Sequence, residues 1–94
     1  MPGSERVPVR KTRGPLDFGL PESGLPDDRA AWYRALDPPL NGDMRFELVN
    51  FVDGTRSVMD IRNAVSAEFG ALPLETVQRY FEDLVRVGVI GWKP

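Results

Sequence analysis

Apolar side chains recur at helical spacing through the second half of the chain. Three segments show this spacing: residues 41–52 (Phe46, Leu48, Val49, Val52), 57–69 (Val58, Ile61, Val65, Phe69) and 73–87 (Val77, Tyr80, Phe81, Leu84, Val85). Positions three and four residues apart share one face of an α-helix, so each segment can bury an apolar face. The pattern therefore predicts three consecutive helices around one core.

The boundaries of these helices carry capping and turn residues. Ser57, with Asp60 three residues later, is an N-cap pair, and Asp53-Gly54 before it is typical of a turn. Gly70 suits the end of the helix that follows. A calcium loop would need alternating oxygen ligands and a distal glutamate, and a phosphate loop would need several glycines and a lysine. The stretch VDGTRSVMDI has neither set of residues. The stretch VDGTRSVMDI is therefore interpreted as the corner between two helices.

The N-terminal part of the chain has a different composition. Residues 1–26 are rich in proline and glycine, which favours an extended arm over helix or sheet. Apolar residues recur within it, so the arm can lie along the domain surface, with a disordered leader as the alternative; they are Val7, Val9, Leu16, Phe18, Leu20 and Leu25. A short helix capped by Asp27 or Asp28 is expected to run to Leu36.

The chain ends with residues of high β-propensity. Gly88 breaks the last helix, and Val89–Trp92 follow as a short strand. With the arm at 1–26 and the domain at 27–94, we expect a mainly α, winged-helix-like three-helix domain with a short C-terminal strand as a rudimentary wing.

Composition argues against several classes of function. The 94 residues include no histidine and no cysteine, which removes the usual general base, the thiolate nucleophile and the commonest zinc ligands. We therefore expect no catalytic, cofactor-binding or metal-binding residues and a protein that is not an enzyme. No apolar run approaches the length of a membrane span, so a cytoplasmic protein, or a domain of a larger one, is expected without a membrane partner.

The charge pattern argues against a nucleic-acid partner. The net charge is −2, and the last predicted helix offers Glu75, Glu82 and Asp83 on faces that water should reach. These carboxylates would repel phosphates if that helix entered a DNA groove. A small basic cluster in the arm is interpreted as solubilising, with contact to nucleic acid or an acidic partner left open; it consists of Arg6, Arg10, Lys11 and Arg13.

Aromatic residues provide the candidate binding surface. Four of them exceed what a three-helix core readily hides, and together with Arg79 they resemble an interaction surface: Trp32, Tyr33, Tyr80 and Trp92. The alternative is that they seal the core against the arm. The strand containing Val89 could also accept a partner strand along its edge. The expected partner is another protein or a domain of the parent chain, and a second copy of the chain is also compatible.

Residues 46–70, continuing through 72–84 and 88–90, resemble a known bacterial pattern. The corner Asp53-Gly54-Thr55-Arg56-Ser57-Val58-Met59-Asp60-Ile61 is similar to one in the winged-helix accessory domain that follows the catalytic domain of di-zinc aminopeptidase-like proteins. The resemblance implies an accessory piece alone, because the zinc ligands of such peptidases include histidines. The expected function is thus a non-catalytic accessory module for protein binding, associated with or derived from a larger protein such as a peptidase.

A weaker similarity links the same corner to peptide-recognition domains, including the peptide chaperone of pyrroloquinoline-quinone assembly. In those domains a leader peptide adds a strand beside the wing, which here would implicate Val77, Tyr80, Phe81 and Val89. They begin with an N-terminal sheet, for which residues 1–26 contain too much proline. Leader binding by strand addition and a winged-helix DNA-binding regulator are the two alternative functions.

Overall fold

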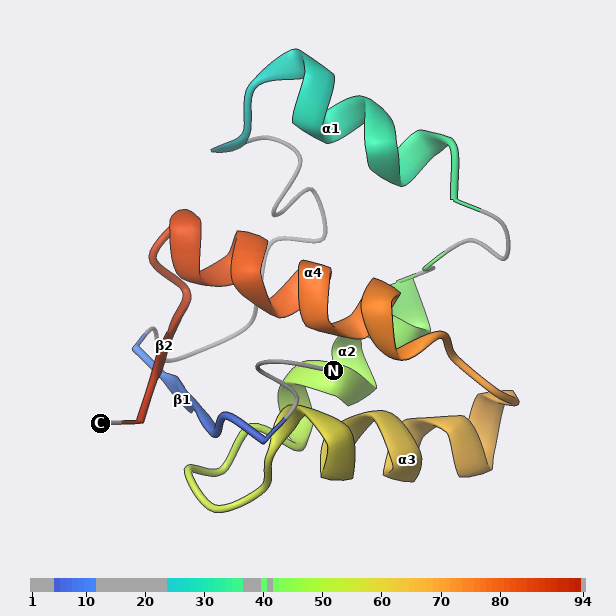
Figure 1. Cartoon of the computed structure of the whole chain (residues 1–94), viewed down its shortest axis with the longest axis vertical. Coiled ribbons are helices and arrows are strands. Elements are labelled where there is room, and N and C mark those ends of the chain that lie inside the picture. The colour runs from blue at the N-terminus through green and yellow to red at the C-terminus, as the bar shows by residue number, and fades with distance from the viewer. Residues whose placement is uncertain (1–4, 12–23, 37–39, 41, 94) are drawn as a thin grey trace.

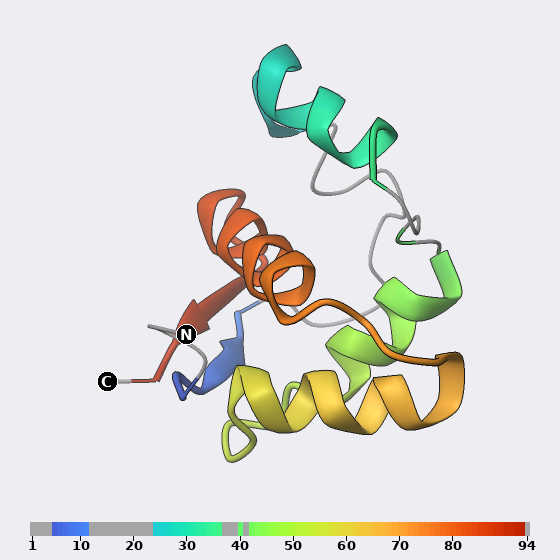
Figure 2. The ribbon, with the colours of Figure 1, turned by 45° about the vertical axis from the view of Figure 1, so that its right-hand side comes forward.

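Four helices and two short strands form along the residues that the computed structural model describes, 5–11, 24–36, 40 and 42–93. Their order is β1 (Pro8–Arg10), α1 (Asp27–Arg34), α2 (Gly42–Asn50), α3 (Val58–Phe69), α4 (Leu74–Arg86) and β2 (Ile90–Trp92). Helix α4 lies between α1 and α3, α2 lies behind, and the strands lie at the end where α4 leads into β2 (Figures 1 and 2). The predicted mainly α fold with a short C-terminal strand is confirmed.

The corner between α2 and α3 has the predicted capping geometry. The Ser57 Oγ accepts a hydrogen bond from the Asp60 amide at 3.1 Å, and the Asp60 carboxylate accepts one from the Ser57 amide at 3.2 Å. Gly54 adopts a φ of 82°, a conformation that L side chains rarely take. These contacts satisfy the first amides of α3 and hold the turn before it.

The core is built from one face each of α2, α3 and α4 together with β2. Its fully buried side chains include Leu48, Val58, Ile61, Val65, Val77, Phe81, Leu84 and Ile90. Most positions predicted from the periodicity are therefore in the core. Phe46 is an exception, because its side chain is 53% exposed on the outer side of α2.

Part of the proline-rich arm forms a strand, which corrects the expectation that proline excludes one. β1 pairs antiparallel with β2, with Val9 opposite Gly91, and the ladder extends through Lys11 N to Val89 O at 3.0 Å. Pro8 lies at a position whose backbone faces away from β2, so its missing N–H costs no hydrogen bond of the ladder. Residues 1–4 and 12–23 of the arm, which include Leu16, Phe18 and Leu20, lie outside the described residues.

Helix α1 begins differently from the prediction. Pro26 is its N-cap, and neither Asp27 nor Asp28 makes a side-chain cap; both lie in the first turn. The Pro26 carbonyl instead accepts from the amides of Arg29 and Ala30 at 3.0 and 2.9 Å. The two carboxylates still lie near the positive end of the helix dipole, where negative charge is favourable.

Candidate interaction site

The six residues predicted to form a protein-binding surface have different surroundings. Trp32, Arg79 and Trp92 are half-buried, so part of each side chain reaches solvent. Three others, Tyr33, Tyr80 and Val89, are buried in the core. A buried side chain has no surface to offer a partner, so the prediction of a contact surface is corrected for these three.

Asp83 on α4 is the residue that departs furthest from the sequence prediction. The carboxylate was expected to face water, but the side chain is only 2% exposed. It accepts a hydrogen bond from Arg29 Nε at 3.0 Å and a second from the Tyr33 hydroxyl, both on α1. A buried carboxylate is costly unless it is paired and hydrogen-bonded, so these contacts require α1 to stay against α4.

Aromatic rings complete the contact between α1 and α4. The Tyr33 and Tyr80 rings meet edge to face with centroids 6.5 Å apart, and the Trp32 and Tyr33 rings do so at 4.8 Å. The Arg45 guanidinium carbon lies 5.2 Å from the centre of the Tyr33 ring. This arrangement fixes the position of Trp32 beside the outward side of α4.

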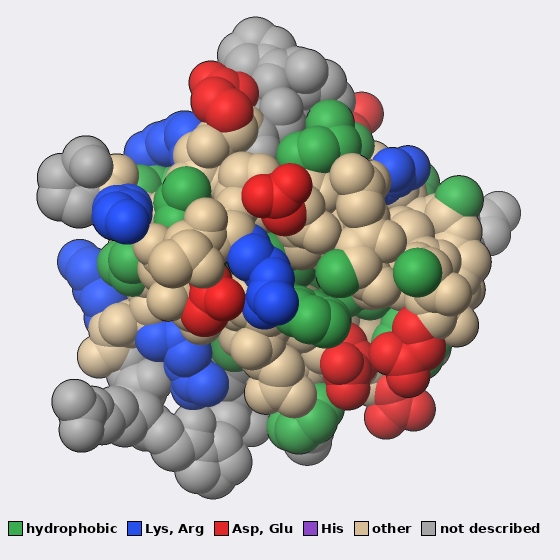
Figure 3. Space-filling model, turned by 90° about the horizontal axis from the view of Figure 1, so that it is seen from below, with side chains coloured by type: hydrophobic (Ala, Val, Ile, Leu, Met, Phe, Trp, Pro, Cys, Tyr) green, Lys and Arg blue, Asp and Glu red, His purple; other side chains and the backbone are tan. Residues whose placement is uncertain are grey.

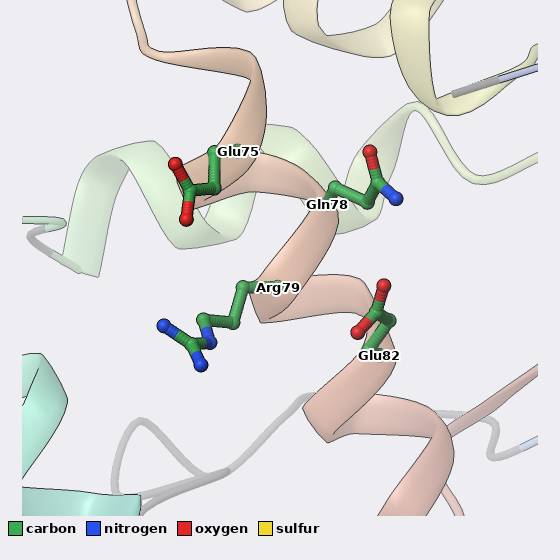
Figure 4. A pocket seen from close by; sticks show the side chains of 4 residues that line it. All are labelled: Glu75, Gln78, Arg79 and Glu82. Atoms are coloured by element: carbon green, nitrogen blue, oxygen red, sulfur yellow. The ribbon is translucent and has the colours of Figure 1, made fainter. Parts of the chain in front are cut away.

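The outward side of α4 carries the candidate site, called here the α4 face. Glu75, Gln78, Arg79 and Glu82 line a shallow hollow of about 200 Å³ (Figure 4). Arg79 extends towards α1, where its guanidinium carbon lies 4.8 Å from the centre of the Trp32 ring. The two glutamates are exposed and flank Arg79 along the helix, and in Figure 4 Arg79 points towards α1 while Glu82 points to the other side of the hollow. The α4 face comprises these four residues and Trp32.

The edges of the two-stranded sheet are largely occupied. One edge of β2 pairs with β1, and on the outer edge of β1 the Arg6 carbonyl accepts from the Val58 amide at 2.9 Å while Pro8 has no amide to donate. On the outer edge of β2, Ile90 is fully buried. A partner strand would therefore find few open backbone groups along the residues that form these strands.

Among the residues that the structure describes, the one carboxyl group with a clearly shifted pKa is that of Asp53, in the turn before α3. Hydrogen bonds from the Thr55 amide and hydroxyl, followed by one from the Arg56 amide, lower the pKa of Asp53 to about 2. Its carboxylate therefore stays ionised at neutral pH and serves as an acceptor that closes the turn.

Within the described parts of the chain, no group of three or more His, Cys, Asp or Glu side chains is arranged to hold a metal ion. The helices described there are all too short or too polar to cross a membrane.

In comparisons with known proteins, no family model matches the chain, and no curated protein or solved structure matches it. The resemblance to the aminopeptidase accessory domain and to the peptide-recognition domains therefore stays a prediction.

Proposed function

We propose that this domain is a non-catalytic interaction module that binds a polypeptide partner through the α4 face. The observation that carries the proposal is the Arg79 guanidinium on the Trp32 ring, with the exposed Glu75 one turn before Arg79 on α4 and the exposed Glu82 one turn after it. Arginine and tryptophan are enriched among the residues that contribute most to protein interfaces. Both side chains are held in place before binding, which lowers the entropy lost when a partner docks.

The charges of the α4 face indicate the chemistry of its partner. Glu75 and Glu82 lie two helical turns apart on α4, with Arg79 between them and already stacked on Trp32. A segment with a lysine or arginine near an apolar side chain would pair its charge with a glutamate and place its apolar group on the exposed part of Trp32. The partner is another protein or a further domain of the parent chain.

The winged-helix DNA-binding alternative is less well supported. In that reading α4 would be the helix that enters the major groove. Its exposed glutamates, Glu75 and Glu82, would then lie against phosphates, and the chain has a net charge of −2. Phosphate neutralisation supplies most of the affinity for a duplex, so this charge arrangement supports a polypeptide partner instead.

Leader-peptide binding by strand addition is also less well supported. That mode depends on main-chain hydrogen bonds to an exposed strand edge. The backbone contacts of Arg6 and the burial of Ile90 leave few such groups. A role as an accessory domain of a peptidase agrees with docking through the α4 face, and it is proposed here on the resemblance of residues 46–90.

Peptide selection tests the proposal directly. A random peptide library of about a dozen residues would be selected on the immobilised chain, and recovered peptides would be titrated against the variant W92F, in which Trp32 is the only tryptophan. We expect recovered peptides to be rich in Lys or Arg and to change Trp32 fluorescence. The double variant E75Q/E82Q should bind the recovered peptides about tenfold more weakly, which is the size expected for the loss of two charge pairs at an interface.

The matched control is D43N/E68Q, which removes two exposed carboxylates from α2 and α3. Its affinity for the recovered peptides should stay within about twofold of the value without these substitutions, because exposed charges away from the site act only through screened, long-range interactions. Recovery of no enriched peptide, or equal weakening by both double variants, would contradict binding through the α4 face.

A further inference from the structure

A second charged surface of the molecule carries mainly cations, whereas the α4 face carries exposed carboxylates. Five exposed cations surround the two strands and the turn before α3, namely Arg6, Arg10, Lys11, Arg56 and Lys93. With Trp92 they are called here the sheet end. Figure 3 shows most of the Lys and Arg side chains of the lower surface over one half, with some Asp and Glu side chains among them, while a further group of Asp and Glu side chains lies at the margin of the other half.

Three distant segments of the chain meet at the sheet end. Arg6 from the arm places its guanidinium carbon 4.2 Å from the centre of the Trp92 ring. Lys93 near the C-terminus donates from Nζ to the Gly54 carbonyl at 3.1 Å. The Lys11 side chain crosses β2 at Gly91, where a Cβ would lie only 2.6 Å from Lys11 Cε. The fold therefore brings Arg56 and Lys93 beside Arg6, Arg10 and Lys11, which already lie close together in the sequence.

Two carboxylates beside the turn that carries Arg56 make contacts within the chain. Asp53 accepts from the Thr55 and Arg56 amides and pairs with Arg56 at 3.2 Å, and Asp60 accepts from the Ser57 amide. Both carboxylates keep their negative charge while they accept these hydrogen bonds. The five cations outnumber these two carboxylates together with Glu5, so positive charge is in excess along the described residues of the sheet end, on a chain whose net charge is negative.

We propose that the sheet end binds an acidic segment of a polypeptide, with side-chain carboxylates as the recognised groups. Arg6 stacks on Trp92, which orients its planar guanidinium while leaving edge N–H groups for a carboxylate. Lys11 and Lys93 add flexible ammonium groups on either side of Gly91. This inference is independent of the α4 face, whose charges favour a basic partner.

The geometry favours an acidic polypeptide over nucleic acid for two reasons. Single strands bind by stacking bases on open aromatic rings, but Trp92 is half-buried and already carries Arg6. Duplex binders commonly neutralise about six to ten phosphates, more than the sheet end has cations. A short acidic segment needs fewer charges and no stacking surface.

The two tryptophans allow each surface to be observed separately. In the variant W32F, Trp92 is the only tryptophan, and it lies in the sheet end. The probe is a synthetic peptide of about a dozen residues that alternates glutamate and serine, with glutamine-serine and lysine-serine peptides as controls. We expect only the glutamate peptide to change Trp92 fluorescence, and its affinity should fall about tenfold between about 50 and 200 mM salt.

Charge removal then locates the site. The variant K11Q/K93Q should weaken the glutamate peptide by about tenfold, whereas R34Q/R86Q, which removes two exposed arginines of the helical body, should change it less than about twofold. Circular dichroism of each variant checks that the fold is kept. If K11Q/K93Q unfolds, the single variants K11Q and K93Q take its place, each with an expected loss of about threefold.

Several outcomes would overturn the inference. Tighter binding of a mixed-sequence duplex or an oligothymidine strand than of the glutamate peptide at the same salt would assign the surface to nucleic acid. Equal loss in K11Q/K93Q and R34Q/R86Q would show that only the overall charge matters. Absence of any response to the glutamate peptide up to millimolar concentration would exclude an acidic ligand at the sheet end.

Discussion

The α4 face and the sheet end each contain an arginine packed on a tryptophan ring, but the charges around the two pairs are opposite in sign. Each stacks an arginine on one of the two tryptophans, Arg79 on Trp32 at 4.8 Å and Arg6 on Trp92 at 4.2 Å. Around the first pair lie Glu75 and Glu82, and around the second lie lysines and arginines. The aromatic-cation pair alone therefore indicates no ligand, and the neighbouring charges carry that information.

The two regions also differ in how they are held together. The α4 face needs α1 to stay docked, and one carboxylate, Asp83, receives both of the hydrogen bonds described above from that helix. The sheet end is held by a backbone ladder, by the link between Arg6 and Val58 and by the side chain of Lys93. A single substitution should therefore damage the α4 face more than any single substitution damages the sheet end.

The largest effect is expected from D83A. It leaves Arg29 without its carboxylate and the buried Tyr33 hydroxyl without its acceptor, so the free energy of unfolding should fall by about 3 kcal/mol. Urea unfolding followed by circular dichroism measures the loss. In the W92F background, Trp32 emission should shift to longer wavelength as α1 separates from α4.

The sheet end serves as the internal reference for D83A. Trp92 emission in the W32F background should stay unchanged, because β2, which carries Trp92, lies on the other side of α4 from α1 (Figures 1 and 2). The control D28N removes an exposed carboxylate from α1 and should cost less than about 0.5 kcal/mol. Equal shifts of both tryptophans in D83A would show that the two regions unfold as one unit.

A smaller effect is expected from S57A, next to the sheet end. The substitution removes the Oγ that accepts from the Asp60 amide and should lower stability by about 1 kcal/mol. Thermal unfolding measures it. S66A is the comparison on the same helix, because the Ser66 Oγ accepts from the Leu72 amide at the other end of α3. A larger change of Trp32 than of Trp92 emission in S57A would contradict the separation of the two regions.

A still smaller and more local effect is expected from G91A. The added Cβ would displace the Lys11 side chain, whose flexible end can move, so the cost should stay below about 1 kcal/mol. In a K11A background the obstacle is gone, and G91A should become neutral or slightly stabilising because glycine weakens a strand. The double-mutant cycle is measured by urea unfolding. An unchanged cost in K11A would assign the effect to the backbone.

The pH dependence of the turn near the sheet end should be the most subtle. The pKa of Asp53 is about 2 in the folded state against 3.8 without the fold, so its ionised form stabilises the turn. This contribution is fully present above about pH 4 and is lost as the pH falls through about 2. The free energies of unfolding of wild type and D53N should therefore depend differently on pH between about 2 and 4. Above about pH 4 the two curves should be parallel.

Hydrogen-deuterium exchange would show the same difference locally, at the amides of Thr55 and Arg56, which donate to Asp53. They should exchange faster in D53N than in wild type at pH 5 to 7, because a carboxylate accepts hydrogen bonds more strongly than the neutral amide oxygen of asparagine. Equal protection in both proteins would mean that the amide oxygen of asparagine closes the turn as well as the carboxylate does.

Local pattern predicted most of the helices and their boundaries. The capping pair Ser57 and Asp60, the turn at Gly54 and the end of α3 at Gly70 are each set by residues close in sequence. The burial of Asp83 could not be predicted in this way, although its position three residues after Tyr80 places both on one face of α4. That spacing was a usable signal, but the partners, Arg29 and Tyr33, lie about fifty residues earlier.

The candidate surfaces were predicted only in part. Trp32, Arg79 and Trp92 remain available for contact, and the exposed glutamates of α4 were foreseen from helical spacing. The sheet end was not foreseen, because residues 1–26 were predicted to be an extended arm without a strand, and the basic cluster therefore had no defined position. Proline is excluded from central strands because it has no N–H to donate, whereas Pro8 occupies an edge position at which the ladder needs no amide donor.

By itself, the sequence determined where helices begin and end, because capping, glycine turns and apolar spacing act over a few residues. The tertiary structure alone decided which charges are exposed together. It buried Asp83 against α1 and brought Arg6, Arg56 and Lys93 to one end of the molecule. The physical reason is that a charge takes its free energy from everything around it in space, whatever its distance along the chain.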